Sequence, residues 1–356
     1  MAEMTSHERF SRMFAHREAD RVPIIDYPWG PTVERWQREG MPEGADFIDY
    51  FGLDKVASIG GDNSPRYPGE TLEETEEYII FRNSWGVTMK NWKHTASTPQ
   101  YLDYTVVDSA AWQEAKARMV ASPERINWDY IKENYSRWRA EGYWIQGGLW
   151  FGYDITHHGM VGTEQLLMAM LEEPEWCVDM FNHELNVGLE LLEMLWDAGY
   201  TFDSVTWPDD MGFKYKTFFS LDVYRELLKP VQKRAVDWAH ARGIKACLHS
   251  CGYIAPIVPE LVEIGMDSLN PIEVKAGMDP LALKAEYGDR LVLHGGINAL
   301  LYNDIEALEA EMRRVIPTMK ENGGYILSSD HSIPSSISFQ DFTRFVEVAK
   351  ELGSYA

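Results

Sequence analysis

The chain has 356 residues, of which 45% are hydrophobic, enough for a large buried core. Its 56 acidic and 33 basic residues give a formal net charge of -23. That charge disfavours nucleic acid or an anionic membrane as a partner, because phosphate binding needs clustered Lys and Arg. The three cysteines, Cys177, Cys247 and Cys251, argue against a secreted disulfide scaffold. With no cationic apolar leader and no membrane-length apolar run, we expect a cytoplasmic protein.

The first 120 residues alternate short periodic segments with irregular sequence. Thr5 and Glu8 have the spacing of a helix capping box, and the pattern after them predicts a short helix. A short strand is expected over 24–27. The region 28–120 is rich in Trp, Pro and Gly, so we expect an irregular lid or insert there, with a hairpin near 73–82.

From about residue 125 onward, short apolar strands alternate with longer helices. We expect strands at 143–148, 204–207, 245–250, 267–270, 291–294 and 324–329, and helices at 128–140, 163–171, 174–198, 221–242, 256–264, 280–287, 304–321 and 339–351. This alternation is typical of a parallel sheet with helical crossovers. The sequence therefore predicts an α/β fold, a single-domain (β/α)8 TIM barrel over 1–356, in preference to an open doubly wound sheet.

The ends of the expected strands carry many polar side chains. In a barrel, the carboxyl-terminal ends of the strands meet at one face, and active sites lie there. Any single member could instead cap a helix or a turn, but a shared site explains the whole set better. These residues are Asp26, Gln146, Asp209, Asp210, His249, Cys251, Asn270, Glu273, His294 and His331.

His249 and Cys251 form a His-x-Cys pair at the end of one expected strand. Residues two apart on a strand share a face, and imidazole and thiolate are zinc ligands. A catalytic zinc site needs a third protein ligand, for which we predict His331, with His294, Glu273 or an Asp in reserve. A core histidine beside buried thiols is the alternative that this short motif leaves open.

His157 and His158 form a second histidine pair, after the strand expected at 143–148. Adjacent side chains diverge, so at most one of the two is expected to face a pocket. A position in a surface loop is the favoured interpretation for either.

Several segments resemble the uroporphyrinogen decarboxylase-like superfamily, and the resemblance spans nearly the whole chain. They are His7-Glu8-Arg9-Phe10, Asp20-Arg21-Val22-Pro23, Pro208-Asp209-Asp210-Met211-Gly212, Leu228-Lys229-Pro230, His249-Ser250-Cys251-Gly252, His294-Gly295-Gly296-Ile297-Asn298 and Ser328-Ser329-Asp330-His331-Ser332-Ile333-Pro334. The resemblance implies a single (β/α)8 barrel with a cleft at its carboxyl-terminal mouth. It also implies one of two chemistries: cofactor-free decarboxylation of uroporphyrinogen, or zinc-dependent methyl transfer linked to a corrinoid.

The residues divide between these two branches. The methyltransferases hold zinc with a His-x-Cys pair and a distant Cys, and here His249 and Cys251 match the pair while His331 stands where that Cys is expected. His331 instead resembles the His that decarboxylases carry near the last strand. The decarboxylases also have an Arg-rich segment after the first strand, whereas this chain has no Arg there before Arg35. Binding a polycarboxylate without those groups would be costly.

The resemblance thus favours a zinc-dependent methyltransferase that moves a methyl group between a small O-, N- or S-methyl compound and a corrinoid (cobalamin) protein. Zinc is expected on His249, Cys251 and His331, and Asp209, Asp210 and His331 are the expected catalytic residues. The expected substrate-binding residues are Asp26, Trp29, Gln146, Tyr153, Asn270, Glu273 and His294, with Trp85 and Trp150 extending an aromatic wall.

Two other functions stay open from the sequence. One is a metal-free decarboxylase or lyase for a small carboxylate, with Asp209 and His331 as proton carriers. The other is a barrel that acts only as a binding or docking subunit. The sequence also leaves open whether the chain forms a homo-oligomer.

Overall fold

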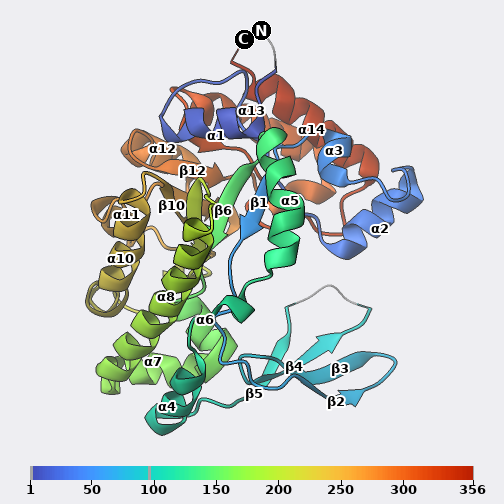
Figure 1. The fold of residues 1–356 in the computed structure, drawn as a ribbon. Coiled ribbons are helices and arrows are strands. Elements are labelled where there is room, and N and C mark those ends of the chain that lie inside the picture. Colours follow the sequence, from blue (N-terminus) through green and yellow to red (C-terminus); the bar gives the residue numbers. More distant parts are fainter. Residues whose placement is uncertain (1–2, 95–97, 356) are drawn as a thin grey trace.

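A curled, parallel seven-stranded sheet forms the centre of the computed structural model, which describes residues 3–94 and 98–355 (Figure 1). The neighbouring strands all pair in parallel. Their order in the sheet is β1 (Val56–Ile59), β6 (Trp144–Gly148), β7 (Ser204–Pro208), β10 (Lys245–His249), β11 (Ser268–Ile272), β12 (Val292–Gly295) and β13 (Tyr325–Ile326). The predicted α/β class, with a parallel sheet and helical crossovers, is confirmed.

The segment 23–28 lies between the two edges of this sheet. Leu327 donates its N–H to the carbonyl of Pro23, and Ile25 donates back to Leu327. On the other side, the N–H of Asp54, just before β1, donates to the carbonyl of Ile24 at 2.9 Å. The strand predicted over 24–27 is therefore an extended segment with isolated bridges, because it is too short to build a ladder on either side.

Helices cover the outer face of the parallel sheet (Figure 1). The longer ones follow the predicted pattern, with buried apolar residues on one face and exposed residues on the other. Those of the second part of the chain are α5 (Trp128–Ala140), α6 (Tyr153–Thr156), α7 (Thr163–Glu172), α8 (Pro174–Asp197), α9 (Leu221–Val223), α10 (Lys229–His240), α11 (Val258–Glu263), α12 (Pro280–Tyr287), α13 (Ile305–Lys320) and α14 (Phe339–Gly353).

Single turns of other helix types interrupt this pattern. A π-helical turn, η2 (His157–Val161), continues α6, and a second one, η3 (Tyr224–Leu228), breaks the helix predicted over 221–242 into α9 and α10. Short 3₁₀ turns are η1 (Pro123–Arg125), η4 (Val274–Ala276) and η5 (Ala299–Asn303), and a small hairpin consists of β8 (Gly212–Phe213) and β9 (Lys216–Thr217). The last sheet strand is also shorter than the predicted 324–329.

The N-terminal helix α1 (Ser6–Phe14) begins at the predicted capping box. The Glu8 N–H donates to the Thr5 hydroxyl at 3.2 Å, and the Glu8 carboxylate accepts from the Thr5 N–H at 2.8 Å. Its buried residues Phe10 and Phe14 stack on Trp144 of β6, which fixes the helix against the amino-terminal end of the sheet.

The prediction of an irregular region over 28–120 is wrong for most of its described part. It contains α2 (Gly30–Glu39), α3 (Phe47–Phe51), α4 (Ser109–Arg118) and strand β1 of the main sheet. It also contains a four-stranded antiparallel sheet of β2 (Glu70–Glu74), β3 (Tyr78–Arg82), β4 (Val87–Trp92) and β5 (Gln100–Tyr104), whose first hairpin confirms the one predicted near 73–82. The rest of this sheet was missed because its strands are short and β5, like β2, is largely exposed, so the segment lacks a clear apolar alternation.

The antiparallel sheet stands apart from the parallel sheet, at the end where α6 lies (Figure 1). Both chain termini lie together at the opposite end, beside α13 and α14. Since β6 leads into α6, this end is the one towards which the parallel strands point. Within the described residues, no helix is both long and apolar enough to cross a membrane.

Candidate active site and metal centre

The carboxyl ends of β7 and β10 bring Asp210, His249 and Cys251 together. These strands are neighbours, with Pro208 paired to His249, so the residues that follow each strand emerge side by side. The Cys251 Sγ lies 3.4 Å from Nε2 of His249, and Oδ1 of Asp210 lies 3.7 Å from the same nitrogen. The three ligand atoms all lie within 4.8 Å of one another.

Neighbouring groups orient this set for metal binding. Nδ1 of His249 contacts the side-chain oxygen of Asn270 on β11 at 2.7 Å. An Nδ1–H that donates to this oxygen leaves Nε2 with a free lone pair, as a metal-ligating imidazole requires. Tetrahedral zinc holds nitrogen and sulfur ligands roughly 3.5 Å apart, given its bond lengths. The donor set and its spacing therefore fit zinc.

The Cys251 thiol is strongly affected by its surroundings. Burial, helped by the carboxylates of Asp210 and Glu273, raises the pKa of Cys251 well above its ordinary value. The sulfur is therefore a thiol at neutral pH unless a cation is present. A bound divalent ion reverses this balance and deprotonates the sulfur.

Asp209 holds the backbone next to this group by hydrogen bonds. Its N–H donates to the carbonyl of His249 at 2.7 Å, and its fully buried carboxylate accepts from Gln232 at 2.7 Å and from the Asp154 N–H at 3.0 Å. Burial raises the pKa of Asp209 to about 8. Its predicted catalytic role stays a prediction, but in the structure it positions the backbone of both Asp154 and His249.

Two cavities meet at His249, and most of the predicted site residues line them. One has a volume of about 260 Å³ and is enclosed by strands of the curled sheet. The other has a volume of about 350 Å³ and is lined by Cys251. They share Ile25, Tyr27 and three of the predicted site residues, His249, Asn270 and His294. The first cavity adds Gln146 and Cys247, and the second adds Asp26, Trp29, Cys251 and His331.

Two groups in these cavities, the partly buried His294 and the buried Asp26, have shifted pKa values. Burial lowers the pKa of His294 to about 3, so its imidazole is neutral at physiological pH. Burial raises the pKa of Asp26 to about 7, although Ser329 donates to it through both its hydroxyl and its N–H. Near neutral pH the His294 imidazole is therefore uncharged and the Asp26 carboxyl is partly protonated.

A comparison of the sequence with protein-family profiles identifies the family of the chain. The profile described as uroporphyrinogen decarboxylase (URO-D) matches residues 155–352, more than half of the chain. The chain belongs to the uroporphyrinogen decarboxylase family. This URO-D family chain is 26% identical over 205 residues to the uroporphyrinogen decarboxylase of Helicobacter pylori (strain P12), an alignment that covers 56% of the chain. It spans about half the length of that curated relative, 52%.

A solved structure also resembles this URO-D family chain. A methyltransferase from Methanosarcina mazei superposes with a TM-score of 0.64, over 99% of this chain and 100% of that one. The two sequences are 17% identical, so the likeness establishes a shared fold. The resemblance to the URO-D superfamily predicted from the sequence is confirmed.

His331 lies apart from the Asp210, His249 and Cys251 group. It is exposed, lines the cavity of about 350 Å³, and turns its ring edge towards Trp29 at a centroid separation of 6.2 Å. Among the described residues, it joins no set of three or more His, Cys, Asp or Glu side chains with ligand atoms within 4.8 Å. Its role as third ligand stays a prediction. Asp210 lies nearer to His249, and an Asp was one of the reserve ligands that the sequence predicted.

The aromatic wall predicted from Trp29, Trp85, Trp150 and Tyr153 is not assembled. Trp85 and Trp150 line a different cavity, and Tyr153 is fully buried under Phe218 and Phe219. Trp85 lies between β3 and β4 of the antiparallel sheet, whereas Trp150 and Tyr153 follow β6, so the sequence order did not show that they line different places. Glu273 also lies outside the two cavities at His249, where it accepts a hydrogen bond from the Gly252 N–H behind Cys251.

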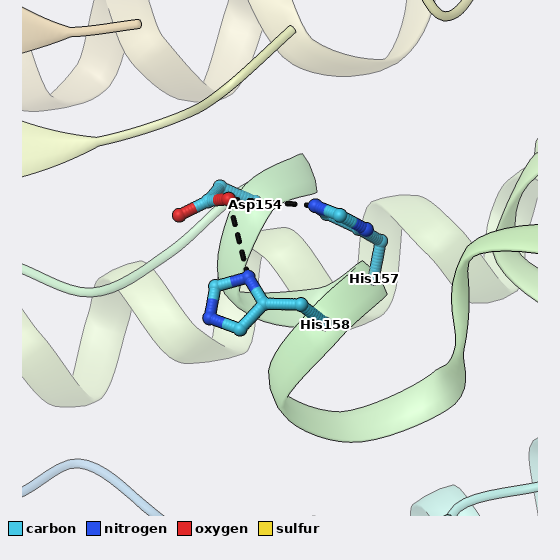
Figure 2. A group of neighbouring side chains, drawn as sticks. All are labelled: Asp154, His157 and His158. Carbon is cyan, nitrogen blue, oxygen red and sulfur yellow. Dashed lines mark hydrogen bonds and ion pairs between the residues drawn. The ribbon is translucent and has the colours of Figure 1, made fainter. Parts of the chain in front are cut away.

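The surface-loop interpretation of His157 and His158 is wrong. Both imidazoles converge on Asp154 in this URO-D family chain (Figure 2). The expectation that adjacent side chains diverge fails here because the segment is helical, and positions three and four residues after Asp154 both flank it. The signal that could have revealed the group is the spacing Asp-x-x-His-His itself.

Proposed function

We propose that the chain is a zinc-dependent methyltransferase that moves a methyl group between a small O-, N- or S-methyl compound and a corrinoid held by a partner protein. The observation that carries the proposal is the Asp210, His249 and Cys251 group at the carboxyl ends of β7 and β10. We take the fold as a (β/α)8 barrel that the segment 23–28 closes, with the site at its mouth, where barrel enzymes have their active sites.

His249 and Cys251 would hold the metal, with Asp210 as the third ligand that the distances favour and His331 as the one that the sequence favours. When bound, zinc supplies a Lewis acid that polarises the heteroatom carrying the methyl group or stabilises the acceptor as its anion. Asn270 keeps Nε2 of His249 turned towards that position. Asp210 also accepts a hydrogen bond from the Cys251 N–H, which fixes the loop that carries the thiol.

The cavity walls support a small substrate of low charge. Among the described residues that line the two cavities at His249, none is Lys or Arg. A polycarboxylate would lose its hydration there without gaining a cationic partner. Trp29 and Tyr27 offer apolar surface beside Cys251, and Asp26 offers a hydrogen-bonding carboxyl group for a polar substituent.

The alternative is a metal-free decarboxylase or lyase that acts on a small carboxylate. The URO-D profile and the Helicobacter relative favour it. Asp209 and His331 would be its proton carriers, but the Asp209 carboxylate is buried and already bound by Gln232 and the Asp154 N–H. No described residue that lines these cavities is Lys or Arg, which also weighs against a carboxylate substrate.

The proposal is tested by metal content and methyl transfer. The protein is purified without chelator, and zinc is measured by mass spectrometry in the parent, His249→Ala and Cys251→Ser. Each substitution should lower bound zinc by about one ion per chain, because a catalytic site needs three protein ligands. Cys247→Ser is the matched control, since Cys247 lies on the same strand but outside the group, and it should keep the zinc.

Methyl transfer is then followed in the visible spectrum of an added corrinoid protein, with methoxy-aromatic, methylamine and methylthiol donors. Activity should appear in the parent and in Cys247→Ser and be lost in Cys251→Ser. Zinc-free protein, or turnover of a carboxylate that survives both chelation and Cys251→Ser, would instead support the lyase.

A further inference from the structure

A second group of metal-ligating side chains lies on α6 and η2. Figure 2 shows the Asp154 carboxylate facing both His157 and His158. Oδ1 of Asp154 lies 3.4 Å from Nε2 of His157 and 3.1 Å from Nδ1 of His158. The three ligand atoms lie within 4.8 Å of one another, and the side chains are 10%, 15% and 26% exposed, respectively.

The local sequence explains this convergence. Positions i, i+3 and i+4 share one face of a helix, so the Asp-x-x-His-His spacing places both rings beside the carboxylate. The two histidines begin the π-helical turn, a feature that is often found at functional sites. A carboxylate and a histidine three residues apart on a helix also supply metal ligands in bundle proteins.

The two oxygen–nitrogen separations are close to those of ligands around one ion. Metal–oxygen and metal–nitrogen bonds of roughly 2.0–2.2 Å place tetrahedral ligands about 3.4 Å apart. A divalent ion would satisfy one carboxylate and two neutral imidazoles together. Two protonated imidazoles would instead repel each other, since their ring centroids are 5.3 Å apart.

Neighbouring residues contact His157 and orient its ring. Nδ1 of His157 lies 3.0 Å from the Thr163 hydroxyl. When this nitrogen donates to Thr163, Nε2 presents a lone pair to the Asp154 oxygen, and a cation between them removes the repulsion. The Tyr153 ring stacks on His157 at 4.7 Å, and its buried hydroxyl has no hydrogen-bond partner among the described residues. The cluster thus has an oriented histidine and an unsatisfied polar group beside it.

The cluster has its own access, separate from the site at Cys251. His158 lines a cavity of about 370 Å³ between the barrel end and the antiparallel sheet, and Tyr101 of β5 lies 5.7 Å from its ring. Trp85, Trp150 and Asn63 are further lining residues. This cavity shares no lining residue with the two cavities that meet at His249. Of the three side chains, His158 is the one that lines this cavity, so a ligand in it would meet the cluster at the His158 ring.

We propose that Asp154, His157 and His158 form a second metal site, which binds a divalent transition-metal ion through one oxygen and two nitrogens. Such a two-histidine, one-carboxylate set suits Zn²⁺ or Fe²⁺ and leaves coordination positions for other ligands, and its His158 lines the cavity of about 370 Å³. It contains no thiolate, in contrast to the group at Cys251. The proposal does not rest on the methyltransferase function.

Cobalt substitution tests the site, because Co²⁺ replaces Zn²⁺ and reports its ligands by absorption. Metal-free protein carrying Cys251→Ser is titrated with Co²⁺, so that the first centre lacks its sulfur ligand. This variant should still bind Co²⁺ with visible d–d bands but without a sulfur-to-cobalt band in the near ultraviolet. Adding His158→Gln or Asp154→Asn should weaken the remaining binding by 10-fold or more, and circular dichroism confirms that each protein is folded.

His240→Ala in the Cys251→Ser background is the matched control. His240 pairs with Asp267 at 2.7 Å but has no second imidazole, so its loss should leave Co²⁺ binding unchanged. Equal Co²⁺ affinity in Cys251→Ser with and without His158→Gln would overturn the proposal and leave the cluster as a hydrogen-bonded carboxylate. That result would not bear on zinc at Cys251, because the parent protein reports that centre by its thiolate band.

Discussion

The N–H of Cys251 donates a 2.7 Å hydrogen bond to Oδ1 of Asp210, the oxygen that also lies 3.7 Å from Nε2 of His249. One carboxylate thus holds the loop that carries the thiol and faces the imidazole beside it. This relationship joins the ends of β7 and β10, and it makes Asp210 both a positioning residue and a candidate ligand.

Asp210→Asn should weaken zinc binding by about 10- to 100-fold, the range found when a supporting or ligating group is removed from a metal site. His331→Ala should change the affinity by less than this, because His331 stands outside the group. Competition with a chromophoric chelator measures both affinities. The reverse order, with the larger loss in His331→Ala, would show that His331 is the third ligand.

Zinc binding should release about one proton at neutral pH, because the raised pKa of Cys251 keeps the free protein's sulfur protonated. Below that pKa, the zinc affinity should rise about tenfold per pH unit. A pH indicator in weakly buffered solution measures the released proton. Cys251→Ser should release less, and an unchanged proton count in that variant would remove Cys251 from the ligand set.

Asp26→Asn should flatten the pH dependence of stability in mildly acidic solution. Burial raises the pKa of Asp26 from 3.8 to about 7 in the folded state, so between these values the folded protein binds a proton that the unfolded chain lacks. The free energy of unfolding therefore falls as pH rises through this window, by up to about 1.4 kcal/mol per pH unit, and levels off above it. Urea unfolding at several pH values measures this slope.

Asp289→Asn is the control for the stability measurement. Its hydrogen bond with Arg290 lowers the pKa of the exposed Asp289 carboxyl, which therefore titrates below the window. The slope should be the same in this variant as in the parent. An Asp26→Asn protein that kept the parent slope would show that Asp26 is already ionised in mildly acidic solution.

Gly152→Ala should destabilise the fold more than an ordinary substitution of a glycine with positive φ. Gly152 has φ 96°, and an added Cβ would lie 2.7 Å from Oδ2 of the buried Asp209. Gly199→Ala is matched in backbone, at φ 88°, but has open space around it, so it should cost about 1 kcal/mol. Gly152→Ala should cost roughly 1–3 kcal/mol more, from overpacking, as urea unfolding would measure. Equal losses of unfolding free energy in the two variants would show that the Asp209 side chain moves aside without strain.

The predicted elements after residue 125 correspond closely to the observed ones, because long amphipathic helices and fully apolar strands have clear periodicity. Helix α5 spans the predicted residues, and α8 and α12 match within a residue. The strand at Val56–Ile59 was missed because four residues carry too little pattern to separate a strand from its loops. Beyond the predicted hairpin near 73–82, the antiparallel sheet was missed for a related reason, since β5 is short and largely exposed.

The sequence by itself predicted that His249 and Cys251 lie on the same side at the end of one strand, because a strand repeats every two residues. It also determined the URO-D resemblance and the order of strands along the chain. Only the tertiary structure decided their partners: β7 lies beside β10 and brings Asp210 to the thiol, while the short β13 leaves His331 exposed at the cavity edge. The choice of partner depends on which strand ends become neighbours when the sheet curls, a long-range property that no local pattern encodes.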